Sequence, residues 1–204
     1  QIIMEQNLIY ILPAFGIIGL IYMLFLSSWV NKQDAGDDKM KKLSGYIANG
    51  AMALLKAEYK MLAVFVVIAG AALGILSATT LIPAGMFIVV SFVIGAIFSA
   101  VAGNIGMRIA TKANVRTATA AQQDGAAAAL TVSFYGGSVM GLCVASLGLI
   151  GLGGLYYFFN GYEQGVHALE GFGMGASVVA LFSRVGGGIF TKSADVGADL
   201  VAKV

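Results

Sequence analysis

The chain has 204 residues, of which 59% are hydrophobic and only 11% are charged. Because charged residues make up about a quarter of a typical soluble domain, this composition excludes a water-soluble globular protein. The single cysteine excludes an internal disulfide framework, and the net charge of +2 is too small to indicate nucleic-acid binding. With 28 glycines and 2 prolines, the composition is typical of closely packed transmembrane helices.

Long stretches without charge predict five membrane spans within a single integral-membrane domain, residues 1–204. About 20 apolar residues cross a bilayer, and residues 8–30 form the first such run. Residues 61–107 carry no charge, and Thr79, Thr80 and Pro83 divide them into spans 61–78 and 84–107. Spans 126–158 and 166–190 follow, and the last helix is expected to continue to residue 204. The predicted fold class is therefore an all-α, polytopic helical bundle.

The basic residues predict the orientation of the chain. In a five-span topology all 12 of them fall on the same side of the membrane. The positive-inside rule then places the N-terminus outside and residues 31–60, 108–125 and 184–204 in the cytoplasm, and we expect a bacterial plasma membrane. The basic residues are Lys32, Lys39, Lys41, Lys42, Lys56, Lys60, Arg108, Lys112, Arg116, Arg184, Lys192 and Lys203.

Several patterns favour a structural interpretation. Residues 50–60, GAMALLKAEYK, predict an amphipathic start of the second span whose lysines face anionic lipid, with contact to a substrate as the alternative. Residues 108–125 are interpreted as a polar connector. Three pairs of glycines have the GxxxG spacing that lets helices approach closely: Gly70–Gly74, Gly137–Gly141 and Gly171–Gly175.

The last segment concentrates its charges on one helical face. At 100° per residue, its five charged residues fall within an arc about 100° wide. Since a charge that faces lipid costs ~2.5–3.5 kcal/mol, this face must be turned toward protein or water. The five residues are Arg184, Lys192, Asp195, Asp199 and Lys203.

The types of charge on this face indicate chemistry. Asp195 and Asp199 lie one turn apart and offer the hard oxygen ligands that suit Mg²⁺, while Lys192 could meet a phosphate oxygen. The pattern therefore indicates a cytoplasmic site for a magnesium–phosphate ligand. The alternative is a solvated helix end with the ion pairs Lys192–Asp195 and Asp199–Lys203.

Residues 184–203, RVGGGIFTKSADVGADLVAK, closely resemble the motif GGGIFTKAADVGADLVGK of membrane-integral, ion-pumping pyrophosphatases. Residues 50–60 and residues 110–121, ATKANVRTATAA, also resemble that family. Two positions depart from the motif, because Ser193 stands in place of an alanine and Ala202 in place of a glycine. The resemblance extends over the whole chain, which corresponds to the N-terminal portion of a pump of about sixteen spans.

The resemblance implies a homodimeric pump in the lipid bilayer that hydrolyses pyrophosphate in the cytoplasm and exports H⁺, Na⁺ or both. By family resemblance Lys192 contacts pyrophosphate, Asp195 and Asp199 bind Mg²⁺, Arg184 belongs to the ion-coupling region and Lys203 has a supporting role. The carboxylates that activate water lie on later helices of such pumps. Residues 1–204 are therefore expected to contain no catalytic residue and to be inactive alone, and neither K⁺ dependence nor the pumped ion is decided by them.

Two other classes of protein remain open at this stage. A CDP-alcohol phosphotransferase also uses an Asp-x-x-x-Asp pair, but the upstream half of its motif is missing and Thr191 occupies the position of its glycine. A transporter or channel subunit could instead line a pore with the charged face.

Overall fold

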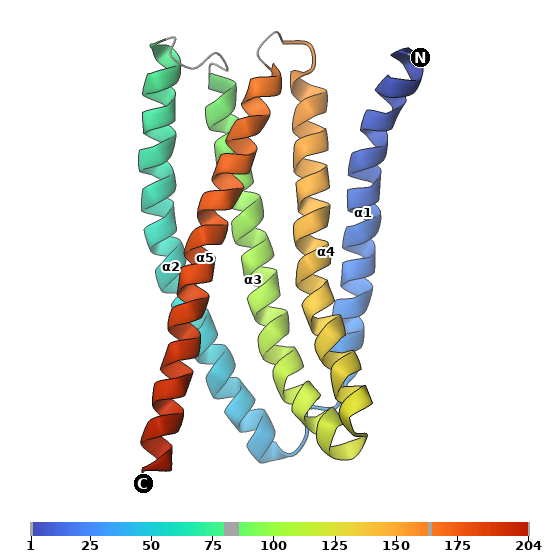
Figure 1. Ribbon diagram of the computed structural model, residues 1–204, viewed down its shortest axis with the longest axis vertical. Coiled ribbons are helices and arrows are strands. Elements are labelled where there is room, and N and C mark those ends of the chain that lie inside the picture. Colours follow the sequence, from blue (N-terminus) through green and yellow to red (C-terminus); the bar gives the residue numbers. More distant parts are fainter. Residues whose placement is uncertain (1, 80–85, 163–164, 204) are drawn as a thin grey trace.

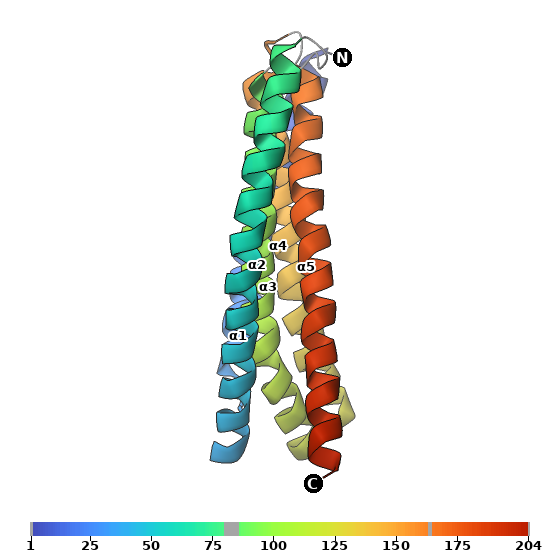
Figure 2. The same ribbon diagram turned by 90° about the vertical axis from the view of Figure 1, so that its left-hand side faces the viewer.

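The computed structural model describes residues 2–79, 86–162 and 165–203, and in them the chain forms long α-helices. Helices that follow one another in sequence run in opposite directions along the long axis (Figure 1). The view at 90° shows that they form a narrow slab (Figure 2). This architecture confirms the predicted all-α helical bundle. The helices are α1 (Ile2–Lys32), α2 (Asp38–Ala78), α3 (Met86–Gln123), α4 (Ala126–Phe159) and α5 (Gly165–Ala202).

All five helices are long and apolar enough to cross a membrane, and each predicted span falls within one helix wherever the structure describes it. In the most apolar 18-residue stretch of each helix, only 11–33% is buried inside the protein. Large side chains such as Phe25, Val67 and Leu130 are about two-thirds exposed. A soluble protein seldom leaves this much contiguous apolar surface uncovered, so the sides of the slab are suited to lipid or to further helices.

The second helix begins much earlier than its apolar run. Asp37 caps its N-terminus, because the carboxylate oxygen Oδ1 accepts a hydrogen bond of 2.7 Å from the backbone N–H of Met40. The helix ends at Ala78, and the N–H of Thr79 bonds to the carbonyl of Ile75 at 3.1 Å. The predicted break after residue 78 agrees with this end, whereas Thr80 and Pro83 lie outside the described residues.

The interpretation of residues 108–125 as a connector was wrong. The third helix continues to Gln123, so only Asp124 and Gly125 separate it from α4. Polar residues continue this helix because alanines favour it and threonine hydroxyls bond to carbonyls within it. Thr119, for example, donates to the carbonyl of Val115 at 3.0 Å. Most of the predicted cytoplasmic segments are thus helices that project beyond the apolar runs.

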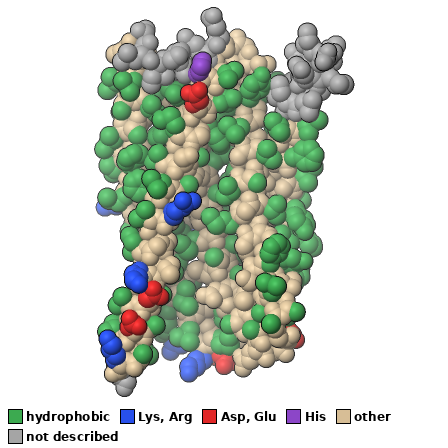
Figure 3. All heavy atoms as spheres, viewed as in Figure 1, with side chains coloured by type: hydrophobic (Ala, Val, Ile, Leu, Met, Phe, Trp, Pro, Cys, Tyr) green, Lys and Arg blue, Asp and Glu red, His purple; other side chains and the backbone are tan. Residues whose placement is uncertain are grey.

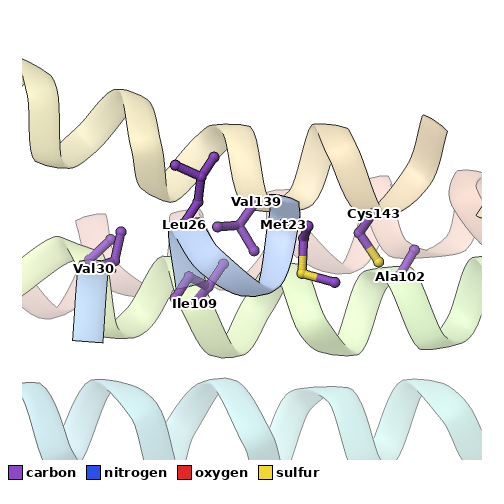
Figure 4. Packing of buried hydrophobic residues seen from close by; sticks show 8 residues of the cluster. Met23, Leu26, Val30, Ala102, Ile109, Val139 and Cys143 are labelled. Carbon is purple, nitrogen blue, oxygen red and sulfur yellow. The ribbon is translucent and has the colours of Figure 1, made fainter. Parts of the chain in front are cut away.

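The third helix is central: it packs against α2, α4 and α5, while α1 packs mainly on α4. Among the described residues three buried clusters hold the slab together, and the smallest of them pairs Ile88 of α3 with Ala168 of α5. The largest joins α1, α3 and α4 (Figure 4), and the second joins α2, α3 and α5. The largest comprises Met23, Leu26, Val30, Ala102, Ile109, Ala113, Val139 and Cys143; the second comprises Leu62, Ala96 and Val179.

Glycines bring α3 and α5 into backbone contact. A Cβ atom at Gly171 would meet the carbonyl oxygen of Ile88, and one at Gly175 would meet that of Phe92. The predicted packing role is confirmed for this pair. At Gly70, Gly137 and Gly141, by contrast, a Cβ atom would find no atom of the described residues within 4 Å, and at Gly74 it would touch only Val89, at 3.9 Å.

Candidate functional site

Charged side chains gather at one end of the slab. The antiparallel order brings the end of α1, the start of α2, the end of α3 and the end of α5 to the same side (Figure 1). Figure 3 shows basic and acidic side chains at this end and along the lower half of α5, whereas the side chains coloured on the rest of this face are mostly hydrophobic, apart from a histidine and an acidic residue near the opposite end. The structure therefore groups the basic segments at one end, as the sequence predicted.

The five predicted site residues lie on α5, which remains α-helical through the glycine triplet at 186–188. All five are exposed. Lys192 Nζ lies 3.4 Å from Oδ2 of Asp195, and the two side chains are 79% and 60% exposed. Within the described residues no ion pair joins Asp199 to Lys203. Only one of the two ion pairs in the solvated-helix alternative is thus formed.

The hydroxyls near this row bond within their own helix. Thr191 donates to the carbonyl of Gly187 and Ser193 to that of Ile189, both at 2.9 Å. Such bonds to the fourth preceding carbonyl satisfy the hydroxyl locally. Ser193, which departs from the family motif, therefore leaves the charged row unchanged.

The two aspartates suit a magnesium ion that also binds a phosphate. They lie one turn apart on α5, and no three His, Cys, Asp or Glu side chains come together among the described residues. A closed protein cage for a metal is therefore not formed by this part of the chain. Mg²⁺ usually keeps several waters and is held by one or two carboxylates together with substrate phosphates, and the donor set of Asp195 and Asp199 fits that arrangement.

Arg184 stands at a cavity of about 500 Å³ between α3, α4 and α5. The cavity is lined largely by apolar and hydroxyl side chains, among them Phe98, Phe172 and Ser183. Arg184 precedes Lys192 by eight residues, which corresponds to about 12 Å along a helix. Arg184 at the cavity is therefore separate from the other four charged residues of α5, which are Lys192, Asp195, Asp199 and Lys203.

A polar cluster joins the connection between α1 and α2 to the end of α3. Arg116 Nε donates to the carbonyl of Gln33 at 3.1 Å, and Gln123 Nε2 donates to Oδ2 of Asp34 at 3.1 Å. The N–H of Gly36 donates to Oδ1 of Asp34 at 2.9 Å. This backbone bond and the bond from Gln123 lower the pKa of the Asp34 carboxyl below its usual value. These hydrogen bonds connect the segment between α1 and α2 to α3, so we interpret the cluster as structural.

Two polar residues that the sequence analysis did not single out lie on α2. The hydroxyl of Tyr59 donates to the carbonyl of Ala100 at 2.6 Å. Oε1 of Glu58 is buried and has no hydrogen-bond partner among the described residues. The available signal was an acidic residue between Lys56 and Lys60 in a segment that resembles the pyrophosphatases, but spacing alone does not reveal what a side chain contacts.

Residues 17–204 match the model of a protein family described as inorganic H⁺ pyrophosphatase. The chain belongs to this family. A Clostridium tetani member that carries the name of a K⁺-stimulated pyrophosphate-energized sodium pump is 49% identical over 98% of the chain. A Methanosarcina mazei member, named a K⁺-insensitive pyrophosphate-energized proton pump, is 44% identical over 98%. The chain spans about 28% of the length of each of these two relatives.

Membership of the inorganic H⁺ pyrophosphatase family confirms the resemblance seen in the sequence. It favours the pyrophosphatase interpretation over a CDP-alcohol phosphotransferase or a channel subunit. The match covers α2 to α5 and the second half of α1, so all five predicted site residues of α5 lie within the matched part of the chain.

Proposed function

We propose that the whole protein is a primary ion pump that hydrolyses magnesium pyrophosphate to two phosphates and exports H⁺, Na⁺ or both. The observation that carries this proposal is the row of exposed charges on the projecting end of α5, within a chain that matches the family along nearly its whole length. The similar relatives named as sodium and proton pumps support the reaction class but leave the pumped ion open.

In this proposal the end of α5 provides one side of the substrate site. Lys192 would contact a phosphate oxygen of the substrate. To do so, its ammonium group exchanges its contact with Asp195 for one with the substrate. Asp195 and Asp199 would hold Mg²⁺, which when bound neutralises phosphate charge in the transition state. Lys203, four residues after Asp199, supports the charge balance of the row. The residues that activate water would lie on other helices.

Arg184 has a different place in the proposal. Its position at the cavity between α3, α4 and α5, about 12 Å along the helix from Lys192, suits a role in linking hydrolysis to ion transfer. An arginine is costly in contact with lipid, so we expect this face of α5 to be covered by protein or water in the whole molecule. We also propose a homodimer in a bacterial plasma membrane, with the N-terminus outside and the charged end in the cytoplasm.

The proposal is tested with the full-length protein in sealed vesicles. Addition of magnesium pyrophosphate should drive either Na⁺ uptake or acidification of the lumen, measured with a sodium tracer and a pH-sensitive dye. Asp195→Ala should abolish both signals at an equal amount of inserted protein. Repeating the assay with and without K⁺ decides whether K⁺ is a cofactor. Wild-type vesicles that hydrolyse pyrophosphate but move neither ion would refute the pump.

A further inference from the structure

The charged end of α5 extends beyond its packing partners. Gly186 is the last buried residue of this helix, and every described residue from Thr191 to the end is exposed. At 1.5 Å per residue, Asp199 lies about 20 Å beyond Gly186. A small shift of the helix at Gly186 is therefore magnified at the residues proposed to bind substrate.

The helix α2 packs against α5 around Gly186. The two helices are antiparallel (Figure 1), and three contacts follow one another along them. The rings of Phe65 and Phe182 lie 5.4 Å apart, Glu58 lies against Gly186, and a Cβ atom at Gly50 would be 3.8 Å from the Phe190 ring. Residues 182, 186 and 190 are spaced by four, so they form one ridge on α5.

The middle contact, between Glu58 and Gly186, leaves no room for a side chain at residue 186. A Cβ atom at Gly186 would lie 2.7 Å from Oε2 of Glu58 and 3.0 Å from its carboxyl carbon. The other carboxyl oxygen, Oε1, is buried and without a hydrogen-bond partner in the described part of the chain. A buried oxygen without a hydrogen-bond partner costs free energy. The end of the half-buried Glu58 side chain therefore acts through its contact with Gly186 and not through hydrogen bonds.

The neighbouring residue fixes α2 itself. Tyr59 is bonded through its hydroxyl to the carbonyl of Ala100 on α3. A Cβ atom at Gly103 would be 3.6 Å from that hydroxyl and 3.7 Å from Oγ of Ser183 on α5, so the three helices meet here. Because the Tyr59 hydrogen bond holds this part of α2 against α3, the backbone of the adjacent Glu58 is held in place where its side chain contacts α5.

The charged row lies on another side of α5. At 100° per residue, Asp195 is about 180° and Lys192 about 120° around the helix from Gly186. Glu58 therefore does not share the face of the proposed ligands, and it makes no ion pair among the described residues. Its effect on them must pass through the position of the helix.

We propose that Glu58 is a positioning residue: seated against Gly186, its carboxyl sets the position of the charged end of α5 and thereby the affinity for magnesium pyrophosphate. This inference rests on the proposed function. Because the contact depends on the shape of the side-chain end and on the absence of a methyl group at residue 186, a neutral isostere preserves it, whereas truncation of Glu58 or a methyl at Gly186 removes it.

The test uses full-length protein and the dependence of phosphate release on magnesium pyrophosphate concentration. Glu58→Ala and Gly186→Ala should each raise KM about tenfold, and the double variant should be no worse than either single variant because both remove the same contact. Glu58→Gln should stay within about twofold of wild type. Gly187→Ala is the control for altered helix propensity, since a Cβ atom there meets no described atom within 4 Å, and it should retain the wild-type KM.

The alternatives give different results. A merely structural role for Glu58 would lower the folded fraction, and hence the apparent kcat, with KM unchanged. The proposal is overturned by that outcome, by a Glu58→Gln variant as impaired as Glu58→Ala, by additive effects in the double variant, or by an equal defect in Gly187→Ala. Absence of hydrolysis in the wild type would instead refute the proposed function, so the two failures are distinguishable.

Discussion

The exposed side chain of Asp34 stabilises the segment that connects α1 to α2. Its carboxylate accepts hydrogen bonds from the N–H of Gly36 and from the amide of Gln123 on α3. Gly36 has a positive φ of 79°, a conformation that glycine adopts readily. Local backbone geometry and a contact between distant helices therefore depend on the same ionised group.

The lowered pKa of Asp34 makes this contribution dependent on pH. Because the folded-state pKa lies below the ordinary value of 3.8, the stabilisation is fully present above that value and is lost as the pH falls through the folded-state pKa. Asp34→Asn should therefore lower the Tm of the purified full-length protein at pH 6, and the difference from wild type should shrink below about pH 4. A difference that stays constant down to pH 3 would contradict this assignment.

At the scale of the elements, the contact between α3 and α5 determines where the site-bearing helix lies. Gly95 of α3 faces the carbonyl of Phe172, and Gly175 of α5 faces that of Phe92. Each helix therefore places a glycine against the backbone of the other. Neither carbonyl can rotate away as a side chain could. The position of α5, and with it the placement of Arg184 at the cavity, depends on these glycines.

Gly175→Ala should separate the two helices and destabilise the full-length protein by about 1–3 kcal/mol, the usual cost of overpacking. The matched control is Gly173→Ala on the same helix, where a Cβ atom meets nothing within 4 Å among the described residues. Unfolding followed in detergent should show a loss for Gly175→Ala only. Equal stability of the two variants would show that α3 and α5 do not rely on this approach.

The elements also show which features can be predicted from sequence. Apolar runs predicted the number of helices, because crossing a bilayer imposes a minimum length. They did not predict that α2 begins at Asp38 or that α3 reaches Gln123, since polar helices beyond the apolar runs have no such constraint. Of the three glycine pairs, spacing could not identify Gly171–Gly175 as the one in backbone contact, because that depends on which helix lies opposite.

For the site, helical periodicity and family resemblance together selected five charged residues of α5. The structure places four of them, Lys192, Asp195, Asp199 and Lys203, on the exposed end of the helix, and Arg184 at the cavity before it. Periodicity could not reveal Glu58, since its contact with Gly186 joins residues 128 positions apart in sequence. A contact of this kind follows from the packing of α2 on α5 and becomes visible only in three dimensions.

At the scale of the molecule, the slab has apolar sides and a charged end (Figure 3). The apolar sides are suited to lipid and to further helices, and the charged end is the part that the proposed function assigns to magnesium pyrophosphate. The length of α5 connects the two, because it passes the cavity at Arg184 and then extends to the row that includes Lys192. In the proposed function this helix would link a change at the substrate to the membrane interior.

The most direct test of the central claim measures phosphate release from magnesium pyrophosphate by the full-length protein and its Asp195→Asn and Asp199→Asn variants. We predict hydrolysis by the wild type, a loss of at least about a hundredfold in each variant, and unchanged activity in Asp124→Asn, an exposed aspartate in the turn between α3 and α4. Wild-type rates in both α5 variants would contradict the assignment of the charged row to the substrate site.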